Sequence, residues 1–129
     1  MRDRFSIAGR PRLWLGLIVV FYAILASLYA IYTPAWQSPD EPAHYNYIRH
    51  LAETGRPPVL RMGDYDQAYL EEIKARRFPP DMPIAPIRYE SHQPPLYYLL
   101  ATPVYWIGGG RLLPLRLFSV ALGACLLLV

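Results

Sequence analysis

The sequence is short of charge, and its single cysteine, Cys125, has no second cysteine with which to pair. A small scaffold held by disulfides is therefore excluded. Charged residues make up 18% of the chain and hydrophobic residues 53%, whereas a soluble domain carries about 25% charge. A disordered chain is excluded because so many large apolar side chains would not remain solvated. No internal repeat is present, which excludes collagen and coiled coils. A membrane protein, or a soluble domain with an unusually apolar surface, remains.

Residues 13–32 form an apolar stretch of twenty residues without a charge. A helix of that length rises about 30 Å, the thickness of the hydrocarbon core of a bilayer. Trp14 near its start and Tyr29 near its end suit the two interfacial belts. The alternative is a secretory signal peptide, but its apolar region spans only about 7–15 residues and precedes a small-residue cleavage site. We therefore predict a transmembrane helix over residues 13–32.

Two further apolar segments lie near the end of the sequence. Residues 113–129 form a second candidate span, whose only charge is Arg116 near its start. This stretch stops without a polar flank, so we expect the chain to be the front part of a longer protein. Residues 94–107 are short for a complete crossing. They form either a re-entrant segment or a span whose first turn begins in the preceding loop.

The distribution of charge predicts a topology. Residues 1–12 carry four arginines and one aspartate (+3), residues 33–93 carry seven basic and nine acidic residues (−2), and residues 108–116 carry two arginines (+2). Basic flanks of membrane spans face the cytoplasm. The N-terminus and the turn at 108–112 are thus predicted inside a cell membrane, with 33–93 as an outer loop. This topology requires 94–107 to cross, which gives three transmembrane helices.

The predicted fold is all-α and polytopic, with one or two short interfacial helices in the outer loop. Ser38, Pro39 and Glu41 resemble a helix start, in which Ser38 is the N-cap and Glu41 the returning side chain of a capping box. Gly55 ends this first helix. A second helix is predicted over residues 66–78. The first helix carries one narrow apolar stripe, which suits a membrane surface.

Asp40 and Glu41 are the strongest candidates for chemistry in the outer loop. Acids are common in a first helical turn because they offset the helix dipole, and this explains them without any catalysis. Their place just outside the first predicted span favours a functional role, since both can meet a lipid headgroup and a second substrate there. A carboxylate that is partly desolvated at such a place becomes a better general base.

Other polar residues have simpler interpretations. Asp40 and His44 are spaced i,i+4 on one helical face, which suits a divalent cation, although a solvated interfacial histidine is the plainer explanation. Asp64 and Asp66 match the D-x-D signature of nucleotide-sugar transferases, but no strand–helix pattern surrounds them. We interpret them as a turn and a helix N-cap. The basic residues form no stripe or recognition motif, so no nucleic-acid partner is expected.

The order of motifs resembles the beginning of a membrane-embedded glycosyltransferase of the GT-C type. A basic N-terminus and one span lead to Pro-Asp-Glu at 39–41, then to His-Gln-Pro-Pro-Leu-Tyr-Tyr at 92–98, then to Arg-Leu-Phe-Ser-Val at 116–120. The sequence is most similar to the bacterial group of protein mannosyltransferase-like, aminoarabinose-transferase-like and Rgt-type enzymes. This resemblance implies transfer of a hexose or pentose from a polyprenyl-phosphate donor at the outer membrane face, to an acceptor that the sequence does not identify.

The resemblance also implies roles for single residues. In the family the first acid of the pair is the catalytic base or positions the acceptor, which maps onto Asp40, with Glu41 as its neighbour. In aminoarabinose-transferase-like members a lysine before two prolines contacts the lipid phosphate, and Gln93 stands at that position here. Arg88 or His92 is then expected to supply the phosphate contact.

The Pro-Pro-Leu stretch of the family corresponds to Pro94, Pro95 and Leu96. The implied reaction is an inverting displacement, in which the base deprotonates the acceptor hydroxyl and polyprenyl phosphate leaves. The family has many more spans, so a chain of this length is expected to be inactive alone. The alternative function is a non-catalytic multi-pass scaffold or assembly protein, which would not need Asp40. A transporter is disfavoured because the predicted spans carry no ionisable side chain except Arg116.

Overall fold

The structure is a computed structural model that describes residues 10–129, and this part of the chain is helical, with no strand. The prediction of an all-α fold is thereby confirmed. Most of the predicted basic N-terminus, residues 1–9, lies outside the described residues. The elements in chain order are α1 (Pro11–Tyr32), α2 (Glu41–Thr54), α3 (Gln67–Ala75), the short 3-10 helix η2 (Tyr89–His92), α4 (Leu96–Ile107) and α5 (Leu112–Leu126).

Among the described helices, α1 alone is long and apolar enough to cross a membrane. Pro11 begins it, at a position where the missing backbone N–H would have no helical partner in any case. Ala30 is the one buried residue of α1, so almost all of its apolar surface is uncovered. Both a membrane span and a signal sequence have these properties. The helices α4 and α5 are apolar but shorter.

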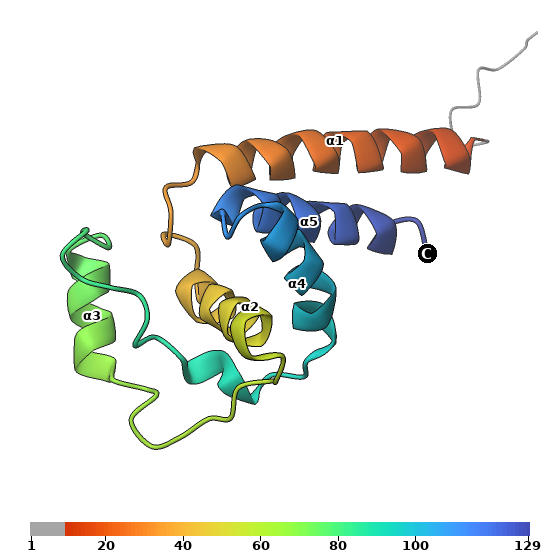
Figure 1. Cartoon of the computed structure of the whole chain (residues 1–129). Helices are drawn as coiled ribbons and strands as arrows, with labels where there is room; N and C mark the ends of the chain where they lie inside the picture. The colour runs from red at the N-terminus through yellow and green to blue at the C-terminus, as the bar shows by residue number, and fades with distance from the viewer. Residues whose placement is uncertain (1–9) are drawn as a thin grey trace, which may run out of the picture.

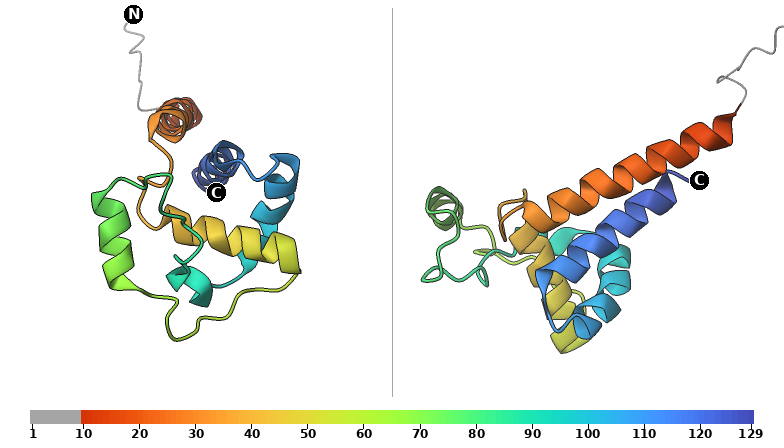
Figure 2. Two further views of the ribbon diagram at one scale, coloured as in Figure 1. Left: turned by 60° about the vertical axis from the view of Figure 1, so that its left-hand side comes forward. Right: turned by 90° about the horizontal axis from the view of Figure 1, so that it is seen from above.

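The helices α1 and α5 lie side by side and run in opposite directions (Figures 1 and 2). Gly123 makes room for the Tyr22 side chain between these helices, because a Cβ atom at this position would overlap the hydroxyl oxygen of Tyr22. Small residues commonly allow such contact between apolar helices in membranes. The packing therefore places the start of α5 beside the end of α1.

The helix α2 lies between α3 and α4 (Figure 1) and contributes to two small cores. Its residues Tyr47, Ile48 and Leu51 pack with Tyr98 and Ala101 of α4. Ala43, one turn before Tyr47, belongs to the second core, together with Leu70, Ile73 and Ile87. The predicted apolar stripe of α2 is thus covered by protein.

The start of α2 differs from the predicted capping box. The helix begins at Glu41 with Asp40 as its N-cap residue, and the Asp40 side chain makes no capping hydrogen bond. Asp40 has a φ of 59°, in the left-handed region that a non-glycine residue seldom occupies. Ser38 is not the N-cap, and the Glu41 carboxylate turns back to accept a hydrogen bond from the Trp36 N–H at 2.8 Å. Glu41 is drawn away from the cap because it has a stronger partner on α5.

The second predicted helix is present but shorter than expected. It spans Gln67–Ala75, and its N-cap is Asp66, whose carboxylate accepts a hydrogen bond from the Tyr69 N–H at 3.0 Å. The carboxylate of Asp64 accepts from the Arg61 N–H at 2.7 Å, within a turn. The interpretation of these two acids as a turn and an N-cap is confirmed.

The turn after α4 lies at the same end of the molecule as the start of the predicted outer loop. The Tyr45 hydroxyl of α2 donates to the Gly110 carbonyl at 2.7 Å. A guanidinium N–H of Arg116, on the first turns of α5, donates to the Thr33 carbonyl just after α1 at 2.6 Å. These contacts bring the turn at 108–112 beside the start of residues 33–93. The crossing at 94–107 and the three-span topology stay predictions.

Candidate functional site

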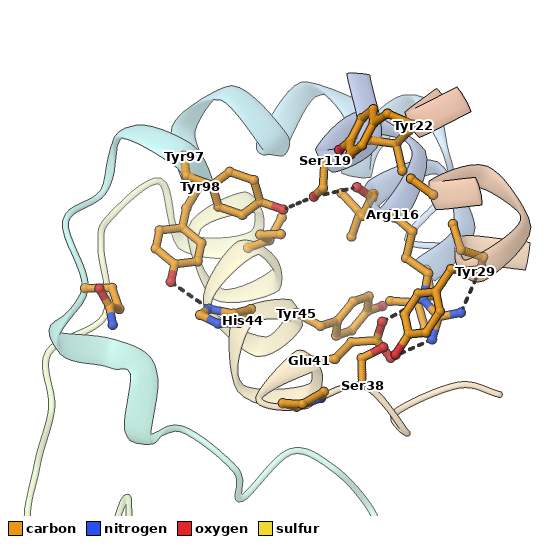
Figure 3. A pocket seen from close by; sticks show the side chains of 18 of the residues that line it. Tyr22, Tyr29, Ser38, Glu41, His44, Tyr45, Tyr97, Tyr98, Arg116 and Ser119 are labelled. Atoms are coloured by element: carbon orange, nitrogen blue, oxygen red, sulfur yellow. Dashed lines mark hydrogen bonds and ion pairs between the residues drawn. The ribbon is translucent and has the colours of Figure 1, made fainter. Parts of the chain in front are cut away.

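A groove of about 1030 Å³ lies between α1, α2, α4 and α5 (Figure 3). Apolar side chains from α1 and α5, among them Leu25, Ala26 and Val120, line one part of it. Polar and charged side chains from the start of α2 and from α5 line another, namely Ser38, Glu41, His44, Arg116 and Ser119. The groove thus joins an apolar channel to a polar cluster, as a site for an amphiphilic molecule would.

The strongest interaction in the polar cluster is an ion pair between Glu41 and Arg116. The Arg116 Nε donates to one carboxylate oxygen at 2.6 Å, and a terminal nitrogen donates to the other at 2.8 Å. Such a two-pronged geometry is the strongest form of a carboxylate–guanidinium contact. The two side chains are only 13% and 12% exposed. The pair therefore fixes the start of α2 against α5, across 75 positions of sequence.

The remaining N–H groups of Arg116 donate to backbone carbonyls at the end of α1 and just after it. One terminal nitrogen donates to the carbonyls of Ala30 and Thr33 at 2.9 and 2.6 Å, and the other also donates to the Pro34 carbonyl at 3.1 Å. The last carbonyls of a helix have no intrahelical partner and attract a cation. Since a guanidinium has five N–H groups, these three contacts and the two to Glu41 use all of them. Arg116 is therefore a structural link among three helices, without a donor left for a ligand.

The residues predicted for the site did not include Arg116. The available signal was a single charge in an otherwise apolar segment, since an ionisable residue in such a place needs a buried partner. The partner of Arg116 could not be predicted from the spacing of residues along the sequence, because Glu41 lies in another helix. Glu41, predicted as a site residue, lines the groove, and the structure gives it a partner that the capping-box prediction did not include.

His44 lies one turn after the start of α2 and lines the groove. Its Nδ1 is 2.9 Å from the hydroxyl oxygen of Tyr98 on α4. Tyr98 is 3% exposed and stacks on Tyr47, with ring centroids 3.6 Å apart and an interplanar angle of 8°. A tightly packed tyrosine thus holds the imidazole ring in one orientation.

Asp40 is turned away from the other two candidates. Its carboxylate accepts a hydrogen bond from the Tyr89 hydroxyl at 2.6 Å, and it does not line the groove. Burial, reinforced by the Asp40 carboxylate, raises the pKa of Tyr89 well above its usual range. Asp40 and His44 are thus bound to different tyrosines. Among residues 10–129 no three His, Cys, Asp or Glu side chains gather into a metal-binding group, and the divalent cation at Asp40 and His44 stays a prediction.

The expected donor-phosphate residues are not gathered at one place. The Arg88 guanidinium lies 3.3 Å from the Nδ1 of His50, outside the groove. His92 is exposed, and its Nδ1 lies 2.9 Å from the Tyr89 carbonyl oxygen. Gln93 does line the groove, and its amide donates to the Glu90 carboxylate at 2.8 Å. Of the three, only Gln93 faces the space that a donor would occupy.

The Pro-Pro-Leu stretch forms the entry to α4. Pro94 lines the groove, Pro95 is the N-cap residue of α4, and Leu96 is its first residue and is 69% exposed. Proline suits this position because its fixed φ is compatible with the first helical turn. The stretch therefore sets where α4 begins, and Tyr97 and Tyr98 follow directly on the groove wall.

Comparisons with known proteins give no relative for this chain. No protein-family model, no curated protein and no solved structure matches it. A functional conclusion therefore rests on the geometry of the groove and on the order of motifs in the sequence.

Proposed function

We propose that the chain forms part of an integral membrane glycosyltransferase of the GT-C type. It would transfer a sugar from a polyprenyl-phosphate donor to an acceptor hydroxyl at the outer face of the cell membrane. The observation that carries this proposal is the groove, which joins the apolar surfaces of α1 and α5 to the polar cluster at the start of α2. A polyprenyl chain suits the apolar part, and a sugar phosphate suits the polar part.

In the proposed arrangement α1 crosses the membrane with the N-terminus in the cytoplasm, and α5 lies antiparallel to it in the outer part of the bilayer, since its fifteen residues rise about 22 Å. The contact between Tyr45 and Gly110 supports an arrangement in which α2 and the turn after α4 share the outer side. The twelve residues of α4 rise about 18 Å, too little to cross a core of about 30 Å. The helix α4 would then lie at the outer surface and dip into it.

Within this function, the ion pair of Glu41 and Arg116 keeps the groove open at its polar end. Asp40 is adjacent in sequence to groove residues and would position the acceptor. Gln93 offers an amide to the donor headgroup from the opposite wall. The phosphate contact expected from Arg88 would require its side chain to leave His50 and reach the groove.

The experiment measures release of free polyprenyl phosphate, because this product forms whichever acceptor takes the sugar. The full-length protein in lipid nanodiscs is incubated with polyprenyl-phosphate hexoses that carry a tritiated sugar. Ala26→Trp fills the groove, and we expect it to lower the rate by at least about tenfold, equivalent to about 1.4 kcal/mol. Ile24→Trp is the matched control, because Ile24 lies on α1 outside the groove and is 54% exposed. Wild-type protein that neither binds nor turns over any of these donors would refute the transferase and favour the scaffold.

A further inference from the structure

Sugar transfer to a hydroxyl needs a group that accepts the acceptor's proton, and the two neighbouring acids are both engaged elsewhere. Both oxygens of Glu41 are bound by Arg116, and one also accepts from the Trp36 N–H. These three hydrogen bonds occupy both oxygens of the Glu41 carboxylate with protein donors. Asp40 is bound to Tyr89 and does not line the groove. Neither acid presents a free lone pair to the space where a substrate would lie.

His44 presents an unengaged ring nitrogen to the groove. It lies one turn beyond Asp40 and Glu41 on α2, and its ring faces the groove between Tyr98 and Tyr45 (Figure 3). Only Nδ1 is engaged, and within residues 10–129 the Nε2 atom has no hydrogen-bond partner. An imidazole that is held through one nitrogen and open at the other has the arrangement of a general base.

The packing around Tyr98 gives this arrangement rigidity. Tyr98 is clamped by the parallel ring of Tyr47 at 3.6 Å, and the Tyr47 hydroxyl in turn donates to the Gln93 carbonyl at 3.2 Å. When the imidazole proton resides on Nδ1, it is donated to the Tyr98 oxygen, and Nε2 is left as the acceptor. The Tyr98 hydroxyl can accept from Nδ1 or donate to it, so the contact fixes the ring orientation, and the proton-accepting state of Nε2 is the tautomer in which Nδ1 carries the hydrogen.

We infer that His44 is the catalytic base of this groove, with Tyr98 as its positioning residue, an assignment that rests on the proposed function. The acceptor hydroxyl gives its proton to Nε2 while its oxygen forms the new bond to the anomeric carbon. The bond from that carbon to the phosphate oxygen breaks, and its electron pair leaves with polyprenyl phosphate. The imidazolium then releases the proton to water, which restores the neutral ring.

The surroundings of His44 make this assignment testable by pH. The titratable groups that line the groove with it are Tyr22 and Tyr29 of α1, Glu41 and Tyr45 of α2, Tyr97 and Tyr98 of α4, and Arg116 of α5. Among these side-chain types, imidazole is the one that exchanges protons in the neutral range. Loss of His44 should therefore remove the acidic limb of the pH–rate profile.

The test compares kcat, KM and the pH profile of His44→Gln, His44→Ala and Tyr98→Phe in the full-length protein, with the same tritiated donors. We expect kcat of His44→Gln to fall about 10²–10⁴-fold with little change in KM for the donor, because general-base help contributes about that much. Added imidazole should partly restore His44→Ala, which a structural role would not allow. Tyr98→Phe should lower kcat less and shift the acidic limb. The matched control is His50→Gln, since His50 lies outside the groove.

The outcomes distinguish a failure of the His44 assignment from a failure of the proposed function. Wild-type activity together with an unchanged pH profile in His44→Gln would overturn the assignment of His44 and leave the transferase standing. Loss of the acidic limb in Asp40→Asn, and not in His44→Gln, would also overturn the assignment of His44 and leave the transferase standing. If His44→Gln loses its fold, as judged by helicity in micelles, imidazole rescue of His44→Ala decides the question. Absence of donor turnover in the wild type would refute the transferase itself.

Discussion

Replacing Arg116 with methionine should destabilise the protein far more than removing a typical surface arginine. The substitution leaves the Glu41 carboxylate with the Trp36 N–H as its remaining partner, and it leaves three carbonyls at the end of α1 without their donor. Breaking a buried ion pair on one side costs about 3–5 kcal/mol. Because both side chains keep 12–13% of their exposure, we expect the low end, about 3 kcal/mol.

A double-mutant cycle measures whether the cost comes from the pair itself. Glu41→Gln should also cost about 3 kcal/mol, since it leaves the guanidinium charge buried. The double variant should cost much less than the sum, with a coupling of about 2 kcal/mol, because neither charge is then left alone. The free energy of unfolding is read from helicity during a titration of dodecyl sulfate into detergent micelles.

Arg76→Met is the matched control for this cycle. Its guanidinium contacts Asp81 at 2.7 Å and Glu72 at 3.9 Å, but the three side chains are 47–62% exposed. Exposed pairs of this kind contribute about 0–1 kcal/mol. A cost for Arg116→Met no larger than for Arg76→Met, or strictly additive costs in the cycle, would refute the view that this pair links the three helices.

Three further results are expected. Cysteines introduced at Gln67 and Gly109, in an otherwise cysteine-free protein in intact cells, should both react with an impermeant thiol reagent, and opposite labelling would favour the three-span topology. Gly123→Leu should cost about 1–3 kcal/mol in the same micelle titration, because the added atoms collide with Tyr22, and a neutral effect would contradict close packing of α1 on α5. Burial raises the pKa of Tyr45 to about 12, so its proton is retained longer in the folded state than in the unfolded state. Its contribution to stability should therefore be constant below about pH 10 and be lost as the pH rises toward 12, a decline that Tyr45→Phe should reduce.

The helices themselves could be predicted from local sequence. The uncharged run before Thr33 predicts α1, Gly55 and the prolines after it end α2, and Asp66 starts α3, all of which the structure has within a few residues. These features depend on neighbouring residues, through backbone conformation and capping. The start of α2 was misplaced by two residues, because Glu41 pairs with Arg116 on another helix instead of capping its own N-terminus.

The sequence by itself determined an apolar helical protein with two adjacent acids, Asp40 and Glu41, after its first apolar stretch, and it showed Arg116 as the one charge of residues 113–129. The tertiary structure alone decided that Glu41 is the partner of Arg116, and that the turn after α4 lies beside α2. It also decided that Asp40 and His44, although one helical turn apart, are bound to different tyrosines. The physical reason is that periodicity and capping act over a few residues, whereas these contacts join side chains 49 to 75 positions apart. Such contacts exist only after α1, α2, α4 and α5 have packed together.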